Sequence, residues 1–323
     1  MNSHPVHVEP PVLSRWASSP TGVAYVHERV AGVHERAAGA PGPEVLVTAL
    51  VHGNEYSGAL ALDAFLRSGL LPRRGRITAA FCNIEAFGNF DAARPDASRF
   101  IDEDFNRVWS ADALDGTGQT AERLRARALR PFVDRATHLL DLHSMHEPCV
   151  PLMVTGLLPR NIAFAQSLQV AGDIIVDAGH ADGQRMRDYG PFGEADGSRI
   201  ALLLEAGQHW DPSSVAVARN MLMRFLLRSG AIDSADVPQG WLMPDAAAAA
   251  PVTVTHRVVA RSMGFEFLGA WRGGEVIPAV GTAIAMDAGE PVLTPYDDCV
   301  LVMPSLRQLR PGVTTVRLGK RGT

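Results

Sequence analysis

Cysteine is scarce in this chain of 323 residues, which contains only three: Cys82, Cys149 and Cys299. Their number is odd and no two of them have a CxxC spacing, so the sequence indicates neither a disulfide framework nor a thiolate zinc site. Such cysteine usage is typical of a reducing compartment, and we expect the protein to be cytoplasmic.

Long apolar runs are also missing. No stretch of about 18 apolar residues occurs, so the sequence predicts no membrane-spanning helix. The first residues, Met1-Asn2-Ser3-His4-Pro5, do not form the cationic region with a following apolar run that a secretion signal needs. We expect no membrane partner.

An excess of positive charge is absent too. The chain has 30 Lys and Arg against 35 Asp and Glu, which gives a net charge of -5 at pH 7. We therefore expect no nucleic-acid partner, because proteins bind nucleic acid through a strongly basic surface. The 46% of hydrophobic and 20% of charged residues are typical of a globular protein, and the length predicts two domains.

Strand-like and helix-like segments alternate in the first part of the chain. Apolar runs of strand length occupy residues 22–27, 45–51, 76–83, 138–142, 151–154, 174–176 and 199–204, and the first of these should form an edge hairpin. Helical patterns occupy residues 57–67, 120–136, 161–171 and 213–228, with Ser57 as the candidate N-cap of the first helix. This alternation favours an α/β fold with a mixed, mostly parallel sheet and flanking helices. Residues 84–119 lack clean periodicity, and we expect substrate contacts in this long connection.

The pattern changes after residue 232. Residues 233–251 contain several prolines and an alanine run and are typical of a linker. Short β-type runs follow at residues 252–260, 264–268, 275–278, 282–286, 291–293, 299–303 and 314–318, with no room for a helix between them. We predict a catalytic domain over residues 1–232 and a small all-β domain, a sandwich or barrel, over residues 252–323.

Polar side chains follow three of the apolar runs. His52 and Glu55 form a His-x-x-Glu pair after the first core strand, His143 follows a second strand, and Glu205 follows a third. One His-x-x-Glu pair is weak evidence, since with 11 histidines in the chain it arises by chance with a probability of about one half. Four such groups are much stronger evidence, because ligands of open α/β sheets bind outside the carboxyl ends of the strands.

Two histidines and one glutamate form the ligand set of a catalytic zinc site that keeps a fourth position for water. We therefore predict one Zn²⁺ per chain, held by His52, Glu55 and His143. Glu205 follows five apolar residues and should be partly desolvated, which raises its pKa toward the range useful for moving protons. The sequence thus predicts Glu205 as the base beside the water.

At this point the sequence resembles the succinylglutamate desuccinylase/aspartoacylase family of zinc carboxypeptidase-like hydrolases. The late β-rich region is also similar to the C-terminal domain of that family. The matching pieces lie in the family's order between about residues 45 and 210: His52-Gly53-Asn54-Glu55, Asn83, Arg99 followed seven residues later by Asn106-Arg107, Asp141-Leu142-His143, and Glu205-Ala206-Gly207.

The resemblance implies a role for each matching residue. His52, Glu55 and His143 would hold zinc, and Glu205 would be the general base and acid. Arg99 would polarise the scissile carbonyl. The substrate-binding residues would be Asn83, Asn106 and Arg107, and the last two would bind the substrate carboxylate.

The sequence departs from the family after His143, where Ser144-Met145-His146 stands in place of the Asn-Thr-Thr of aspartoacylase. No arginine matches the one that would bind a second carboxylate, for which Arg185 and Arg187 are candidates. The dicarboxylate specificity of the family is therefore not carried over. Further candidates for the acyl pocket are His146, His209 and Trp210.

These observations predict a zinc-dependent amidohydrolase that cleaves an N-acyl amino acid or a similar small amide bearing a carboxylate. A metallocarboxypeptidase acting on short peptides is the nearest alternative. A non-catalytic binding or metal-storage protein is another, although Glu205 argues against it because zinc binding does not require a fourth carboxylate. The sequence leaves open the acyl group, the amine and the oligomeric state, including a homo-oligomer.

Overall fold

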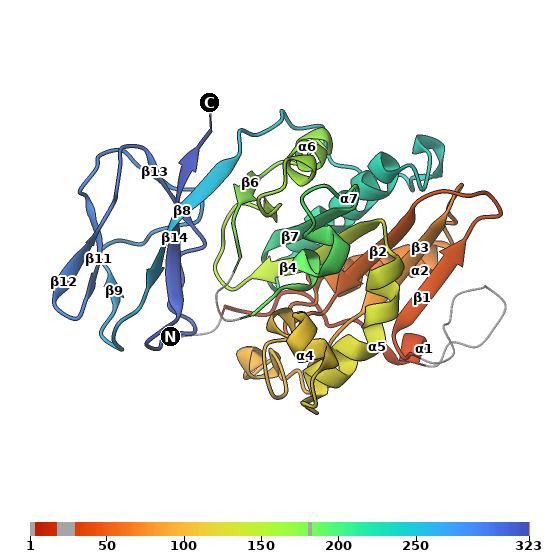
Figure 1. Cartoon of the computed structure of the whole chain (residues 1–323), viewed down its shortest axis with the longest axis horizontal. Coiled ribbons are helices and arrows are strands. Elements are labelled where there is room, and N and C mark those ends of the chain that lie inside the picture. The colour runs from red at the N-terminus through yellow and green to blue at the C-terminus, as the bar shows by residue number, and fades with distance from the viewer. Residues whose placement is uncertain (1–3, 18–29, 180–182, 323) are drawn as a thin grey trace.

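The computed structural model describes residues 4–17, 30–179 and 183–322. Its centre is an eleven-stranded sheet in the order β1-β3-β2-β4-β7-β5-β6-β8-β14-β13-β10 (Figure 1). The strands of its first part are β1 (Val33–Ala37), β2 (Glu44–Ala49), β3 (Arg76–Phe81), β4 (His138–Met145), β5 (Leu152–Val154), β6 (Asp173–Val176) and β7 (Ile200–Gln208). The later strands are β8 (Val252–Val259), β10 (Val276–Ile277), β13 (Cys299–Val302) and β14 (Thr314–Arg321).

The four central strands β3, β2, β4 and β7 run parallel to one another. Their cores are apolar on both faces, and all nine residues of β7 are buried. Parallel strands read as continuous hydrophobic runs because helices cover both faces of the sheet. The predicted α/β fold with a mostly parallel sheet is therefore confirmed.

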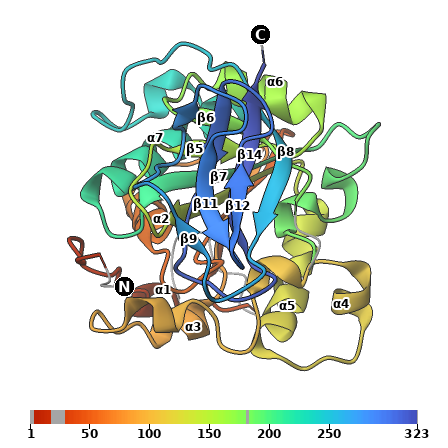
Figure 2. The same ribbon diagram turned by 90° about the vertical axis from the view of Figure 1, so that its left-hand side faces the viewer.

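Helices lie on opposite faces of this sheet (Figure 2). One hydrophobic core joins α2 (Ser57–Ser68), α6 (Pro159–Ser167) and α7 (Pro212–Ser229) to one face. A second core joins α5 (Ala121–Arg135) and α4 (Ala111–Asp115) to the other. None of the described helices combines the length and the apolar character that crossing a bilayer requires.

The C-terminal residues form two antiparallel sheets. Strands β8, β14, β13 and β10 extend the large sheet, and β9 (Glu266–Phe267), β11 (Ala283–Asp287) and β12 (Glu290–Leu293) form the second. A core that includes Ile284, Leu301 and Val316 lies between them, as in a sandwich. Two residue pairs between β6 and β8 connect this region to the rest of the large sheet. The domain boundaries at residues 232 and 252 remain a prediction.

Residues 84–119 are less irregular than expected and contain α3 (Ile84–Gly88), α4 and the 3-10 helices η1 (Pro95–Ser98) and η2 (Phe105–Arg107). The edge of the sheet is β1, while the strand expected at residues 22–27 lies outside the described residues. The prediction of Ser57 as an N-cap is wrong, because Tyr56 takes that position and Ser57 begins the helix.

Side chains at the N-termini of α2 and α7 should differ in how much they contribute to stability. Ser57 Oγ is buried and has no hydrogen-bond partner among the described residues, so Ser57→Ala should leave stability unchanged or increase it slightly. Asp211 caps α7 by accepting the Ser213 N–H at 2.7 Å, so Asp211→Ala should destabilise the protein by about 1 kcal/mol. Urea unfolding of both variants measures the difference, and an equal loss would show that Ser57 acts as a cap.

Candidate metal centre

The carboxyl ends of β2, β4 and β7 bring the predicted site residues together. His143 and Glu205 are directly paired on β4 and β7, so their side chains leave the same face of the sheet. His52 and Glu55 lie in the loop that follows β2. Gly53 is required in this loop, because a Cβ there would lie 2.3 Å from the carbonyl oxygen of Ser98.

The candidate ligand atoms of His52, Glu55 and His143 all lie within 4.8 Å of one another. Glu55 stands between the two imidazoles, with Oε1 2.7 Å from Nδ1 of His52 and Oε2 2.9 Å from Nδ1 of His143. All three side chains are buried. Two nitrogens and a carboxylate at this spacing are the donor set that zinc takes in catalytic sites.

The ionisation of these groups also fits a metal site. Burial alone would raise the pKa of Glu55, but the adjacent His52 and His143 outweigh burial and hold the pKa well below its ordinary value. Burial would lower the pKa of His143, but the carboxylates of Asp141 and Glu55 raise it well above its ordinary value. A cation of higher charge can therefore replace the imidazole proton at this point.

Each histidine has a second carboxylate behind it. The Nε2 atom of His143 lies 2.8 Å from Oδ2 of Asp141, and Nε2 of His52 lies 3.0 Å from Oδ1 of Asp104. Such partners orient imidazole ligands, and here they hold both rings with Nδ1 facing Glu55. The sequence analysis did not single out Asp104, and it gave Asp141 no role.

Glu205 lies beside the cluster and belongs to no ion pair within it. Its side chain is 9% exposed, and Oε2 has no hydrogen-bond partner among the described residues. Burial and then the charge of Glu55 raise its pKa well above the ordinary value, against the opposing charges of His143 and Arg99. A buried carboxyl with a raised pKa and a free oxygen is suited to take up and release a proton.

Arg99 is also at the cluster. Its Nη1 donates to Oε1 of Glu55 at 2.9 Å, and its Nη2 lies 3.0 Å from Nε2 of His52. Nη2 also lies 3.5 Å from Oδ2 of Asp104. The structure thus places a guanidinium against two of the three candidate ligands.

Asn106 and Arg107 are connected to the candidate ligands through other residues. Oδ1 of Asn106 accepts the backbone N–H of Met186 at 3.0 Å, and the Asn106 side chain is buried. Nη2 of Arg107 lies 4.0 Å from Oδ2 of Asp104, and its Nη1 donates to the carbonyl of Asn106 at 2.9 Å. Asp104 therefore connects Arg107 to the candidate ligands.

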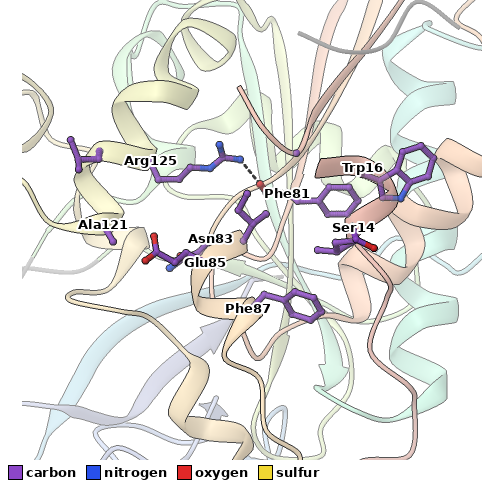
Figure 3. A pocket seen from close by; sticks show the side chains of 13 residues that line it. Ser14, Trp16, Phe81, Asn83, Glu85, Phe87, Ala121 and Arg125 are labelled. Atoms are coloured by element: carbon purple, nitrogen blue, oxygen red, sulfur yellow. Dashed lines mark hydrogen bonds between the residues drawn. The ribbon is translucent and has the colours of Figure 1, made fainter. Parts of the chain in front are cut away.

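Asn83 takes a different position. Its Oδ1 accepts the backbone N–H of Ala86 at the start of α3, and its Nδ2 donates to Oε1 of Glu122 at 2.9 Å. It also lines an apolar cavity of about 670 Å³ (Figure 3). Both polar atoms of the side chain are therefore bonded inside the protein, and neither is hydrogen-bonded to His52, Glu55 or His143.

The remaining candidates divide into two groups. His209 is buried beside the site, with Nδ1 2.8 Å from Oγ of Ser144 and its ring centroid 4.6 Å from that of His146. Trp210 donates through Nε1 to the carbonyl of Asn54. Arg185 and Arg187 are engaged elsewhere, since both donate to the carboxylate of Asp188, as residues that hold a loop do.

Comparison with known proteins gives a match in sequence. Residues 41–188 match the succinylglutamate desuccinylase/aspartoacylase catalytic domain. A probable aspartoacylase from Parasynechococcus marenigrum (strain WH8102) is 36% identical over 135 residues, which are 40% of this chain and 43% of that protein. The chain thus matches less than half the length of this relative.

Solved structures match over most of the chain. A succinylglutamate desuccinylase from Vibrio parahaemolyticus has a TM-score of 0.65 at 14% identity, covering 90% of this chain and 86% of that one. A succinylglutamate desuccinylase/aspartoacylase from Rhodobacter sphaeroides has a TM-score of 0.64 at 18% identity, covering 90% and 89%. The product-bound ectoine utilization protein from Ruegeria pomeroyi has a TM-score of 0.61 at 18% identity, covering 89% and 88%. These likenesses show the fold.

The carboxylate behind His143 gives a test of the metal site. Asp141→Asn keeps the size of the side chain but removes the negative charge from Nε2, so Zn²⁺ affinity should fall about 10–100-fold. Competition with a chromophoric chelator measures this affinity. Asp91→Asn, which changes an exposed carboxylate paired with Arg94, is the control and should bind Zn²⁺ like the wild type. Unchanged affinity in Asp141→Asn would contradict the proposed geometry.

The raised pKa of Glu205 predicts a pH effect on the metal-free protein. Above about pH 4.3 the unfolded chain loses the Glu205 proton, whereas the folded protein keeps it. Folding then takes up a proton, so this group lowers stability progressively as pH rises. Glu205→Gln should therefore stabilise the chelator-treated protein, by an amount that grows as the pH rises above about 5. Thermal unfolding measures it, with the exposed Glu194→Gln as control, and a constant difference would contradict the raised pKa.

Proposed function

We propose that the chain is a member of the succinylglutamate desuccinylase/aspartoacylase family, whose catalytic domain matches residues 41–188, and that it is a zinc-dependent amidohydrolase. Its substrate is an N-acyl amino acid or a similar small amide bearing a carboxylate, which it cleaves into a carboxylic acid and an amine. The observation that carries the proposal is the His52, Glu55 and His143 cluster with a buried, non-ligand carboxyl, Glu205, beside it.

His52, Glu55 and His143 would hold one Zn²⁺, which would lower the pKa of a water molecule to about 7 and polarise a carbonyl. Glu205 accepts a proton from the attacking water at Oε2, the oxygen that has no partner among the described residues. It then gives this proton to the amine as the C–N bond breaks. The raised pKa of Glu205 favours the first transfer, because it makes this carboxylate a stronger base than an exposed one.

Arg99 stabilises the negative charge that develops on the carbonyl oxygen. Its guanidinium is held at the cluster by Glu55 and Asp104, so it needs little reorganisation when the charge appears. A preorganised donor of this kind contributes about 3–4 kcal/mol to the transition state in other enzymes.

Arg107 and Asn106 bind the substrate carboxylate. Arginine is planar and always charged, which suits bidentate carboxylate binding, and the amide of Asn106 adds a neutral donor. For Asn83 the proposed substrate role rests on the family resemblance alone, since its contacts are with Ala86 and Glu122.

The proposed location is the cytoplasm. Cys82, Cys149 and Cys299 are all free thiols, as is usual for proteins kept in a reducing compartment. The proposed partner is the small-molecule substrate.

A panel of N-acyl amino acids, with amine release as the signal, tests the function of the zinc-loaded protein. Glu205→Gln keeps the shape of the side chain but cannot accept a proton, so turnover should fall about 10²–10⁴-fold while zinc content stays near one per chain. Retained activity, or loss of zinc, would show that Glu205 is not the base. Amino-acid release from short peptides alone would indicate a carboxypeptidase, and binding without turnover a binding protein.

A further inference from the structure

Two groups of the site lie on one irregular loop. Residues 99–104 connect η1 with η2, and they carry Arg99 at one end and Asp104 at the other. Arg99 contacts Glu55, and Asp104 contacts His52. The loop lies outside the sheet, so its backbone N–H groups need acceptors from elsewhere in the protein.

Glu122 supplies these acceptors. Its Oε1 accepts the N–H of Ile101 at 2.7 Å and Nδ2 of Asn83 at 2.9 Å. Its Oε2 accepts the N–H groups of Asp102 at 3.1 Å and Glu103 at 3.3 Å. Three consecutive loop N–H groups thus converge on one carboxylate, whose side chain is 0% exposed.

The position of Glu122 in the first turn of α5 makes this arrangement rigid. A carboxylate is favourable at a helix N-terminus, where the N–H groups carry partial positive charge. The loop returns the interaction, since Oδ2 of Asp102 accepts the N–H of Ala121 at 2.8 Å. On its other side, the loop is bound to the His52 loop, because the carbonyl of Arg99 accepts the N–H of Gly53 at 3.0 Å.

We propose that Glu122 is a positioning residue for the catalytic site, which acts by fixing the loop that presents Arg99 to Glu55 and Asp104 to His52. This inference rests on the proposed function. Even a small displacement of Arg99 or Asp104 matters, because a shift of about 1 Å in a catalytic group can reduce the rate about 10²-fold. The proposal also includes Asn83 in this hydrogen-bond network, because Asn83 connects Glu122 to the start of α3.

Glu122→Gln is the variant that tests the proposal. Glutamine has nearly the same volume but only one acceptor oxygen, and its NH₂ group would face loop N–H groups that need an acceptor. We expect kcat to fall at least about tenfold while KM changes less than about twofold, because Asn106 and Arg107 lie on η2, beyond the three N–H groups that Glu122 accepts.

The dependence on Arg99 separates positioning from general destabilisation. In an Arg99→Ala background, Glu122→Gln should reduce kcat by a smaller factor than in the wild type, because one of the two groups that Glu122 positions is already gone. Additive losses in the double variant would overturn this part of the proposal, as would an unchanged kcat in the single variant.

Glu103→Gln is the matched control. It makes the same chemical change within the loop itself, but the Glu103 carboxylate binds Arg123 and Thr120 and accepts none of the three loop N–H groups. We expect activity within about twofold of the wild type, since partly exposed ion pairs contribute little. A loss as large as that of Glu122→Gln would show that any disturbance of the loop has this effect, and it would overturn the specific role of Glu122.

Two readouts do not depend on turnover. Amide hydrogen exchange of residues 101–103 should be faster in Glu122→Gln than in the wild type, and Zn²⁺ affinity should fall about tenfold as Asp104 loosens behind His52. If the wild type hydrolyses no substrate in the panel, the proposed function fails, while these readouts still test the positioning. Unchanged exchange and affinity would refute the positioning itself.

A second variant covers the case in which Glu122→Gln does not fold. Glu122→Asp keeps the charge and both oxygens but is one methylene shorter, so the carboxylate cannot reach all four donors. It should change kcat, exchange and Zn²⁺ affinity in the same direction and by less. Wild-type values for all three would contradict the proposal.

Discussion

The site depends on one buried carboxylate that faces two buried imidazoles. Glu55 is 3% exposed, and each of its oxygens lies within 3 Å of a histidine Nδ1. His143 reaches it only because β4 is in register with β2, with Ala49 opposite Leu142. A shift of one residue would turn His143 to the other face of the sheet, so the pairing of these strands determines whether the cluster exists.

Basic and acidic side chains alternate around the Glu55 carboxylate. The two imidazoles contact Glu55, the carboxylates of Asp141 and Asp104 contact the imidazoles, and Arg99 contacts both Glu55 and Asp104. Such a network is stable only if every member is held in place, because an unpaired buried charge is costly. Glu205 lies beside this network, and its Oε2 has no hydrogen-bond partner among the described residues.

The sequence singled out the candidate residues that follow apolar strands. His52, Glu55, His143 and Glu205 were candidates because a polar residue after a buried run lies at the edge where parallel strands end, and the structure brings the first three within 4.8 Å of one another. Asp104 and Glu122 could not, since Asp104 lies in an aperiodic region and a glutamate in a first helical turn is ordinary until a loop folds over it. Ser57 misled the prediction because residue type alone does not show which residue begins the helix. The pairing of β6 with β8 is a contact between distant segments that local patterns do not contain.

The central claim is that two imidazole nitrogens and one carboxylate bind a single zinc ion. X-ray absorption spectroscopy of the protein loaded with one equivalent of Zn²⁺ tests it directly. We expect two imidazole nitrogens at about 2.0–2.1 Å from the zinc ion, and oxygen ligands at about 2.0–2.2 Å in the remaining positions. In His143→Ala we expect only one imidazole nitrogen. A sulfur ligand at about 2.3 Å, or three or more imidazoles, would contradict this claim.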